Sequence, residues 1–599
     1  MLNIIPTPKH IEEREGTLSL SGICAFLSDG CDGRVVRAVA GLCEEIGKRT
    51  GEQAALFASE PRGKRLSVRH GECGEGYRLS VFEEGIDLWG DGAAGAFWGV
   101  ATLMQLVMAY GAEIPFLEIS DSPEFSYRGF YHDVTRGRVP TLRKLKEIAD
   151  LLAALKINSL QLYVEDAFTF KELGGIVTSE CALTPSEILE LDAYCRERFI
   201  ELIPSMASFG HLFTLLQSES YNHISELPGH KMTRNYWLER QWHHTVNVYH
   251  PETEKVIVSM LEQYIPLFSS EYFNICCDET MDLCNGANAG CDKGEAYFYH
   301  LNKLISTVKA HGKKVMMWGD ECMARPEIFR ERVPEDTVIL NWCYRREVNE
   351  WIPKFFYEQG YSQIACTGTS CWESFAENVL ISTGNIESFA AHAKKYGALG
   401  ILNTNWGDFG HICPFNCNLY GLLFGAEKSW NPDSETGEDF ELSASRLLYG
   451  VDFNMADTLR ALSRASFTAN WSEFVIWHSA VTLEGKSIPL DFGGRYSAER
   501  CIASKEACRR EVERLSSLSE RSVAVEDLIL SARAIELMNR EVLYVNGEAG
   551  YTDGAALQRD FDLWLSDYSA AWLRDGKPSQ LFRIEEFIRS ITKVPVKGE

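Results

Sequence analysis

The 599-residue chain has few positive charges for its size. It carries 59 Lys and Arg against 85 Asp and Glu, a formal net charge of −26. Phosphate backbones and anionic membrane surfaces attract clustered Lys and Arg, and no basic block interrupts this acidic balance. Nucleic acids and membranes are therefore excluded as expected partners.

Long apolar runs are also missing. The most apolar stretch, 97–110, is shorter than the roughly 20 residues that a membrane-spanning helix needs. The first nine residues lack the basic and apolar segments of a secretory signal. We therefore expect a cytoplasmic protein.

The 18 cysteines form no compact framework, which favours reduced thiols over a disulfide scaffold. Cys276, Cys277, Cys284 and Cys291 are near one another in sequence, but they contain no C-x-x-C pair and no His spacing completes a zinc pattern. The sequence predicts neither a metal nor another cofactor.

With 45% hydrophobic residues the chain can build a large core, and its pattern changes twice along its length. Residues 1–120 mix short strand-like runs with two helical patterns, which indicates an α+β domain. Residues 121–428 alternate short apolar runs with amphipathic stretches, and residues 429–599 are helical. We expect a (β/α)8 TIM barrel between a small α+β domain and a helical C-terminal region.

Eight apolar runs are candidates for the barrel strands. They are Arg128–His132, Asn158–Tyr163, Glu201–Ser205, Tyr272–Cys276, Lys314–Met317, Val338–Trp342, Ser362–Cys366 and Gly400–Asn403. The active site of such a barrel lies at the C-terminal ends of the strands. Polar and aromatic residues recur just after these runs, where the barrel mouth should be.

The run that ends at Asp278-Glu279 indicates the chemistry. Adjacent residues leaving a strand point in different directions, so the two carboxylates can take different tasks. An ordinary retaining glycosidase needs two carboxyl groups about 5–5.5 Å apart on either side of the bond, which neighbours on one strand rarely achieve. A 2-acetamido group on the substrate removes that need, because its own carbonyl oxygen can attack the anomeric carbon.

Over about residues 1–425 the chain resembles glycoside hydrolase family 20, the β-N-acetylhexosaminidases. The resemblance rests on Ile4-Ile-Pro-Thr-Pro8, Gly76-Tyr-Arg-Leu79 to Leu106, Tyr127-Arg128-Gly129 with Asp133 and Arg136, Lys156-Ile-Asn158 with Asp166, Phe209-Gly-His211, Asp278-Glu279 and Trp406-Gly-Asp408. It implies retaining, substrate-assisted hydrolysis of a non-reducing terminal GlcNAc or GalNAc through an oxazolinium intermediate. The implied partner is a glycan or glycoconjugate ending in N-acetylhexosamine, and homodimerisation stays open.

The resemblance also implies roles for single residues. Asp278 would hold the acetamido N–H and Glu279 would be the acid and then the base. The expected substrate-binding residues are Arg128, Asp166, His211, Trp318, Trp342, Tyr344, Trp372, Trp406 and Asp408. Among them Tyr344 is a candidate for the hydroxyl that holds the acetamido carbonyl, because the chain reads Thr367-Gly-Thr-Ser-Cys-Trp372 where many members carry Pro-Trp-Tyr.

Other interpretations of the same residues remain. A lone Asp-Glu pair is often a solvated strand end, and each Trp could be an ordinary core aromatic. His211 could be a structural loop residue or could orient the acid. For the whole chain, the alternatives are an inactive sugar-binding barrel and a metal-dependent barrel hydrolase.

Overall fold

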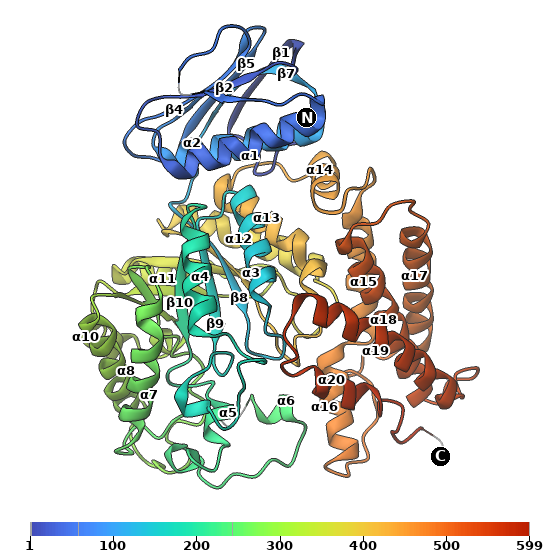
Figure 1. Cartoon of the computed structure of the whole chain (residues 1–599). Coiled ribbons are helices and arrows are strands. Elements are labelled where there is room, and N and C mark those ends of the chain that lie inside the picture. The colour runs from blue at the N-terminus through green and yellow to red at the C-terminus, as the bar shows by residue number, and fades with distance from the viewer. Residues whose placement is uncertain (1–2, 58, 242–243, 598–599) are drawn as a thin grey trace.

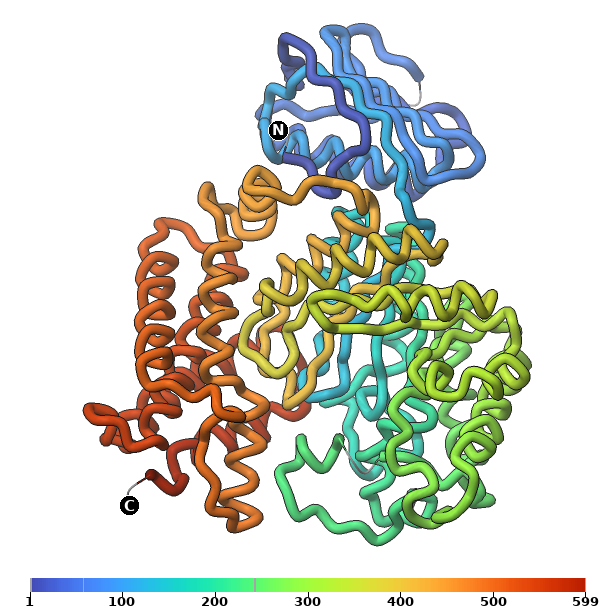
Figure 2. Tube along the Cα trace, turned by 180° about the vertical axis from the view of Figure 1, so that it is seen from behind, coloured from blue at the N-terminus to red at the C-terminus, as the bar shows by residue number. Residues whose placement is uncertain are grey.

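The computed structural model describes residues 3–57, 59–241 and 244–597. An N-terminal domain lies at one end of a central barrel, and a layer of C-terminal helices flanks the barrel (Figure 1). The tube seen from behind shows the same three parts (Figure 2). The predicted fold class is confirmed.

The N-terminal domain is a seven-stranded sheet covered on one face by two helices. The strand order is β1-β7-β5-β6-β4-β2-β3. The strands are β1 His10–Ser19, β2 Cys24–Leu27, β3 Leu56–Phe57, β4 Arg65–His70, β5 Tyr77–Phe82, β6 Gly85–Gly90 and β7 Glu113–Asp121, with helices α1 Gly33–Thr50 and α2 Ala93–Tyr110. By length and composition α2 could span a membrane, but it packs in the core of this domain, where Trp98 and Leu103 are buried. It lies on the side of the sheet that faces the barrel (Figure 1).

Eight parallel strands close into a barrel in chain order from β8 to β15. They are β8 Tyr127–Asp133, β9 Ser159–Val164, β10 Glu201–Met206, β11 Tyr272–Asn274, β12 Lys314–Trp318, β13 Val338–Trp342, β14 Gln363–Gly368 and β15 Gly400–Asn405. Each overlaps one of the eight predicted runs. The strands are buried on both faces, which explains why they are nearly continuous apolar runs.

Helices connect the strands around the outside. They are α3 Leu142–Ala154, α4 Pro185–Arg196, α5 Phe213–Leu216, α6 Tyr236–Glu239, α7 Thr253–Tyr264, α8 Lys293–Ala310, α9 Asp320–Ala324, α10 Pro326–Arg332, α11 Trp351–Gln359, α12 Val379–Lys395 and α13 Leu419–Trp430. The loops that carry α5 and α6 lie at the end of the barrel opposite the N-terminal domain (Figure 1).

The C-terminal region is helical. Its helices are α14 Glu438–Tyr449, α15 Met455–Thr468, α16 Trp471–Thr482, α17 Ala498–Ser516, α18 Val523–Val545, α19 Gly554–Asp575 and α20 Leu581–Ile588. Trp471 donates its indole N–H to the carbonyl of Phe409 at 2.9 Å, and the Tyr568 hydroxyl donates to the carbonyl of Ile412 at 2.9 Å. These helices therefore brace the loop that follows β15.

Buried charges join the N-terminal domain to the barrel. Lys156 and Asp121 are fully buried, and Lys156 Nζ lies 3.4 Å from Asp121 Oδ2. The same ammonium donates to the Tyr77 hydroxyl at 2.9 Å and lies 4.5 Å from the centre of the Trp430 ring. The pair is compensated by several partners, as a buried charge requires.

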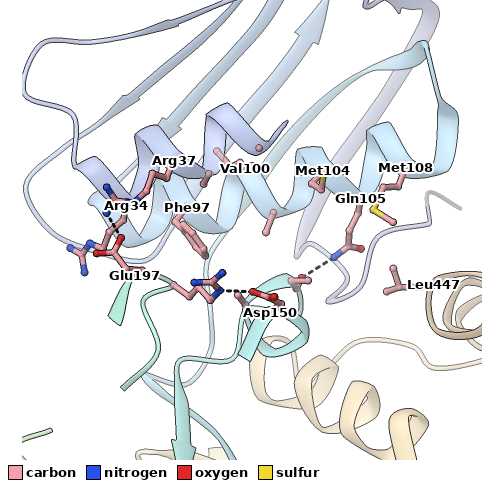
Figure 3. A pocket seen from close by; sticks show the side chains of 16 residues that line it. Arg34, Arg37, Phe97, Val100, Met104, Gln105, Met108, Asp150, Glu197 and Leu447 are labelled. Carbon is pink, nitrogen blue, oxygen red and sulfur yellow. Dashed lines mark hydrogen bonds and ion pairs between the residues drawn. The ribbon is translucent and has the colours of Figure 1, made fainter. Parts of the chain in front are cut away.

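Beside this contact a groove of about 780 Å³ runs between the two domains. Phe97 and Met104 of α2 line its upper wall, and Asp150 of α3 lies on the barrel side (Figure 3). At one end Arg37 forms an ion pair with Glu197. The interior of the groove is mainly apolar, and charged side chains lie at its edge.

Candidate active site

The catalytic candidates Asp278 and Glu279 follow β11. This strand ends at Asn274, earlier than predicted, because Cys276 and Cys277 adopt left-handed backbone angles with φ of 59° and 69°. Glu279 is also left-handed, with φ of 47°. Such angles are costly for residues other than glycine and are enriched at functional sites. The irregular segment lets the two neighbouring carboxylates reach the barrel mouth in different directions.

A pocket of about 210 Å³ opens at the carboxylate pair. Six of the residues predicted to bind substrate line it together with the pair: Trp318, Trp342, Tyr344, Trp372, Trp406 and Asp408. Three further residues complete the lining: Arg136, Gln241 and Glu373. The barrel thus brings together residues from seven of its strand ends and their loops.

Aromatic rings form the walls of this pocket. Trp342 stacks on Tyr344 with ring centres 5.4 Å apart, and Trp372 meets Tyr344 edge to face at 5.0 Å. Trp406 packs beside Trp318 at 5.7 Å and donates its indole N–H to the Tyr344 hydroxyl at 2.8 Å. Since that hydroxyl accepts from Trp406, its own proton can be donated into the pocket. Apolar faces of pyranose rings pack well on such walls.

His211 contacts both catalytic candidates. Its Nε2 lies 3.4 Å from Asp278 Oδ2 and 3.5 Å from Glu279 Oε2. An added Cβ on the preceding Gly210 would lie 2.9 Å from the Asp278 carbonyl oxygen, so only glycine permits this approach. His211 is buried and lies behind the pocket. Its place is that of a positioning residue, rather than of the predicted substrate contact.

The proton of this cluster is held mainly by His211. Burial opposes its charge, but the charge of Asp278 and the carboxylate oxygens that face its Nε2 outweigh that effect and raise the pKa of His211 to about 10. The adjacent His211 ring outweighs burial at Glu279 and lowers the pKa of Glu279 to about 2. Glu279 was expected to be the acid, whereas in this site the imidazolium of His211 carries the proton and the Glu279 carboxylate is ionised.

This arrangement makes stability depend on pH. A His whose pKa rises from 6.5 to about 10 on folding stabilises the fold fully below pH 6.5, and the stabilisation is lost as the pH rises through about 10. We expect urea denaturation at pH 7 and pH 9.5 to show a larger loss of unfolding free energy in the wild type than in His211→Asn. His300→Asn is the control, because burial lowers the pKa of His300 to about 4 and it stays neutral throughout. Equal losses in wild type and His211→Asn would contradict the assignment.

Asp320 supports the pair from the next strand end. Its Oδ2 accepts the backbone N–H of Glu279 at 3.1 Å. Burial, followed by the charge of Asp278, raises the pKa of Asp320 to about 7. The side-chain oxygens Asp278 Oδ1 and Asp320 Oδ1 are both buried without a hydrogen-bond partner among the described residues. The Asp278 carboxylate lines the pocket, where it can accept an incoming N–H donor.

The prediction for Arg128 is wrong. Arg128 is the second residue of β8, so it lies at the end of the barrel away from the mouth. It is fully buried, donates to the carbonyls of Lys156 and Phe125 at 2.8 and 2.9 Å, and forms an ion pair with Glu75 of the N-terminal domain. Its role is to hold the two domains together.

Arg136, rather than Arg128, is the arginine that lines the pocket. Its guanidinium lies in the pocket wall, 5.0 Å from the centre of the Trp406 ring. It is 3.3 Å from an oxygen of Asp133 and 3.6 Å from Asp408 Oδ1. The sequence signal was present, because Arg136 follows the C-terminal end of β8 by three residues.

Asp166 does not line the pocket, so its predicted contact with substrate is also wrong. Its two oxygens accept hydrogen bonds from the hydroxyls of Thr135 at 2.7 Å and Thr214 at 2.6 Å. It faces a separate cavity beside the pocket. The preceding Glu165 is closer to the site, with Oε1 3.6 Å from Arg136 Nε.

Glu373 is a pocket residue that the sequence did not indicate. It follows Trp372 with a left-handed φ of 60°, and burial together with the charge of Asp408 raises its pKa to about 7. Near neutral pH it can therefore donate as well as accept a hydrogen bond. Beside it, Gln241 donates its amide to Asp408 at 3.4 Å. Both residues come from irregular loops, so periodicity gave no signal for them.

Comparison with known families agrees with this architecture. Residues 125–396 match the model described as "Glycosyl hydrolase family 20, catalytic domain", and residues 1–122 match the model for domain 2 of the same family. Together they cover most of the chain up to the end of α12.

Among curated proteins, a beta-hexosaminidase from Porphyromonas gingivalis is 24% identical over 388 residues, which are 57% of this chain and 47% of that protein. A lacto-N-biosidase from Bifidobacterium bifidum is 22% identical over 417 residues, which are 66% of this chain and 34% of that protein. The chain thus spans less than half the length of these two relatives.

Solved structures share the fold. A chitobiase from Flavobacterium johnsoniae superimposes with a TM-score of 0.62 at 19% identity, covering 94% of this chain and 96% of that chain. An exo beta-N-acetylglucosaminidase from Vibrio harveyi has a TM-score of 0.60 at 18% identity, covering 77% of this chain and 78% of that chain. The chitobiase coverage extends the likeness into the C-terminal helices.

Proposed function

The chain belongs to glycosyl hydrolase family 20, and from this premise we propose that it is a retaining exo-β-N-acetylhexosaminidase that releases terminal GlcNAc or GalNAc. The observation that carries the proposal is the pocket itself. Asp278 and Glu279 lie in a space of about 210 Å³ walled by four indoles, with Arg136 and Asp408 facing the same space. Its size suits one terminal sugar rather than a stretch of polysaccharide.

The residues divide the reaction between them. The acetamido carbonyl oxygen attacks the anomeric carbon and forms the oxazolinium ring, while Glu279 gives a proton to the departing oxygen. Asp278 accepts the acetamido N–H and stabilises the positive charge that develops on the ring. Water then attacks the same carbon with Glu279 as base, and two inversions retain the β configuration.

His211 positions the two carboxylates. Its Nε2 lies 3.5 Å from Glu279 Oε2 and 3.4 Å from Asp278 Oδ2, and Glu279 regains its proton from the attacking water. Tyr344 can donate its hydroxyl proton to the acetamido carbonyl, which would orient that oxygen for attack. Both residues act by holding reacting groups in an attack geometry, the effect that makes intramolecular catalysis efficient.

A chromogenic assay tests the proposal. Aryl β-N-acetylglucosaminide and aryl β-N-acetylgalactosaminide should both be tried, with the matching aryl β-glucoside as a control that lacks the acetamide. Release of phenol from at least one N-acetylhexosaminide, with the glucoside nearly inert, is the expected result. A chain that binds GlcNAc but hydrolyses neither substrate would instead be an inactive sugar-binding barrel.

A metal-dependent hydrolase is the second candidate, and one observation favours testing it. Ligand atoms of His211, Asp278 and Glu279 lie within 4.8 Å of one another, which is close enough to hold an ion. Activity that survives prolonged treatment with EDTA would exclude this candidate. Activity that falls with EDTA and returns with Zn²⁺ would replace the acid–base assignment given above.

The corrected arginine assignment gives a prediction. Arg136→Lys keeps the charge but loses the planar guanidinium, so we expect KM for an aryl N-acetylhexosaminide to rise about tenfold or more. Arg128→Lys should leave KM unchanged and lower the thermal midpoint, because Arg128 joins the domains. Steady-state kinetics and thermal unfolding of both variants check this. A raised KM in Arg128→Lys alone would reverse the correction.

A further inference from the structure

A second buried histidine, His244, packs directly on His211 and takes no part in the reaction described above. The two imidazole rings stack with their centres 4.7 Å apart and their planes inclined by 13°. His244 is completely buried and comes from the loop between β10 and α7. Since His211 faces both catalytic carboxylates, His244 is separated from the reacting groups by a single side chain.

His244 holds the backbone of His211. Its Nδ1 accepts the backbone N–H of His211 at 3.0 Å, and its own carbonyl oxygen accepts the next N–H, that of Leu212, at 3.0 Å. His211 has a left-handed φ of 57°, which is unfavourable for a residue other than glycine unless its surroundings fix it. One residue therefore satisfies two consecutive N–H groups at the turn that aims the His211 ring.

The remaining ring nitrogen of His244 fixes its tautomer. Nε2 lies 2.9 Å from the carbonyl oxygen of Gln241, so this nitrogen donates while Nδ1 accepts, and the ring is neutral. Burial, followed by the positive charge of His211, lowers the pKa of His244 well below its usual value of 6.5. Only one ring of the stack is charged. Gln241 itself lines the catalytic pocket, so His244 also holds a residue of the pocket wall.

The backbone of His244 is joined to the loop of the catalytic pair. The N–H groups of His244 and Thr245 both donate to Asp282 Oδ2, at 2.9 and 3.2 Å. Asp282 follows Glu279 by three residues. His244 thus connects the loop after β10, which carries His211, with the loop after β11, which carries the two carboxylates.

We propose that His244 is a positioning residue for the hydrolysis: it holds His211 so that its Nε2 faces both Asp278 and Glu279. The inference rests on the proposed function, because it assigns a role within that reaction. Those two separations are 3.4 and 3.5 Å, and a misplacement of about 1 Å in a catalytic site can cost about 10²-fold in rate. His244 acts through His211 and not on the substrate.

Steady-state kinetics on an aryl N-acetylhexosaminide test the proposal. His244→Phe keeps a flat ring but loses both ring hydrogen bonds, so kcat should fall by about tenfold or more. KM should change by less than about threefold, since His244 does not bind the sugar. His244→Asn should recover part of the loss, because its side-chain oxygen can accept the His211 N–H.

His300→Phe is the matched control. It too removes a ring hydrogen bond of a buried histidine, the one between His300 Nε2 and the Ser208 carbonyl at 3.0 Å. The His300 ring packs on Phe209, in the same loop as His211. Its kcat should stay at the wild-type value even where its thermal midpoint falls as far as that of His244→Phe.

A double-mutant cycle separates positioning from a general structural role. In the His211→Asn background, His244→Phe should lower kcat by less than about twofold further, because the residue through which it acts is gone. Equal losses in the two backgrounds, or a wild-type kcat in His244→Phe, would overturn the proposal. If His244→Phe did not fold, the same cycle with His244→Asn would decide the question.

Failure of the proposed function would give a different result. A wild type that hydrolyses no N-acetylhexosaminide would refute the function alone. Crystal structures of the wild type and of the folded His244 variant would then test the positioning role directly. A displaced His211 ring would support it, and unchanged separations of Nε2 from Asp278 and Glu279 would overturn it.

Discussion

Replacing Glu279 by Gln is expected to lower kcat by about 10²–10⁴-fold on substrates with poor leaving groups, because general acid catalysis contributes about that much. On activated phenyl glycosides the loss should be much smaller, since those leaving groups need little protonation. Steady-state rates on a series of aryl N-acetylhexosaminides with different phenol pKa values measure this slope directly.

The control for this variant is Glu271→Gln. Glu271 is an exposed acid just before β11 and is paired with Lys314 at 2.9 Å. The variant therefore removes a carboxylate next to the same strand without changing the pocket. Its rates should match the wild type. If Glu279→Gln lost the same factor on every leaving group, the residue would not be the acid.

Replacing Asp278 by Asn should lower kcat by about 10²–10³-fold, the loss typical when a stabiliser of transition-state charge is removed. The reason is its position: the Asp278 carboxylate lines the pocket beside Glu279, where it can accept the acetamido N–H. A thiazoline analogue should inhibit the wild type strongly as an intermediate mimic and inhibit Asp278→Asn far less. Inhibition constants for both chains provide the measurement.

The same mechanism excludes a protein nucleophile. Asp278 and Glu279 are neighbours in the chain, so when one reaches the leaving oxygen the other is poorly placed for attack from the opposite face. Mass spectrometry of a stalled reaction should detect no glycosyl ester on an Asp or Glu. Trapping such an ester, or brisk turnover of a plain β-glucoside, would falsify the assignment of the acetamide as nucleophile.

The barrel could be predicted from the sequence because its strands are buried on both faces. Each strand is then a short apolar run, as in Val338–Trp342, and the residues after each run fall at the mouth. The indoles of Trp318, Trp342 and Trp406 follow this rule, and all three line the pocket. Burial would not distinguish these residues from core aromatics, because Trp318 is only 1% exposed although it lines the pocket.

The errors at Arg128 and Asp166 have different causes. Arg128 is the second residue of β8, so its position in the strand places it at the end away from the mouth. The family motif nevertheless implied a substrate contact for it. Asp166 follows β9 by two residues, but two threonine hydroxyls turn its carboxylate toward the neighbouring cavity. No sequence pattern encodes such a side-chain direction.

The protonation state of His211 could not be predicted from the sequence either. His211 follows β10 by five residues, and its contact with Asp278 depends on the loop path and on Gly210. Pairwise distances of 3.4 and 3.5 Å decide which group is charged, and they arise only when separate strands close into the barrel.

The buried Lys156–Asp121 pair limits how this enzyme can be recombined. The two partners come from different domains and neither has access to water. A chimaera could take residues 1–122 from a distant homologue with an apolar residue at position 121. The Lys156 ammonium would then be buried without its carboxylate partner, which would lower the free energy of unfolding by about 3–5 kcal/mol. The sheet domain and the barrel should therefore be exchanged together in a chimaera. The crossover point should lie after Trp430 rather than in the short link between Asp121 and Tyr127.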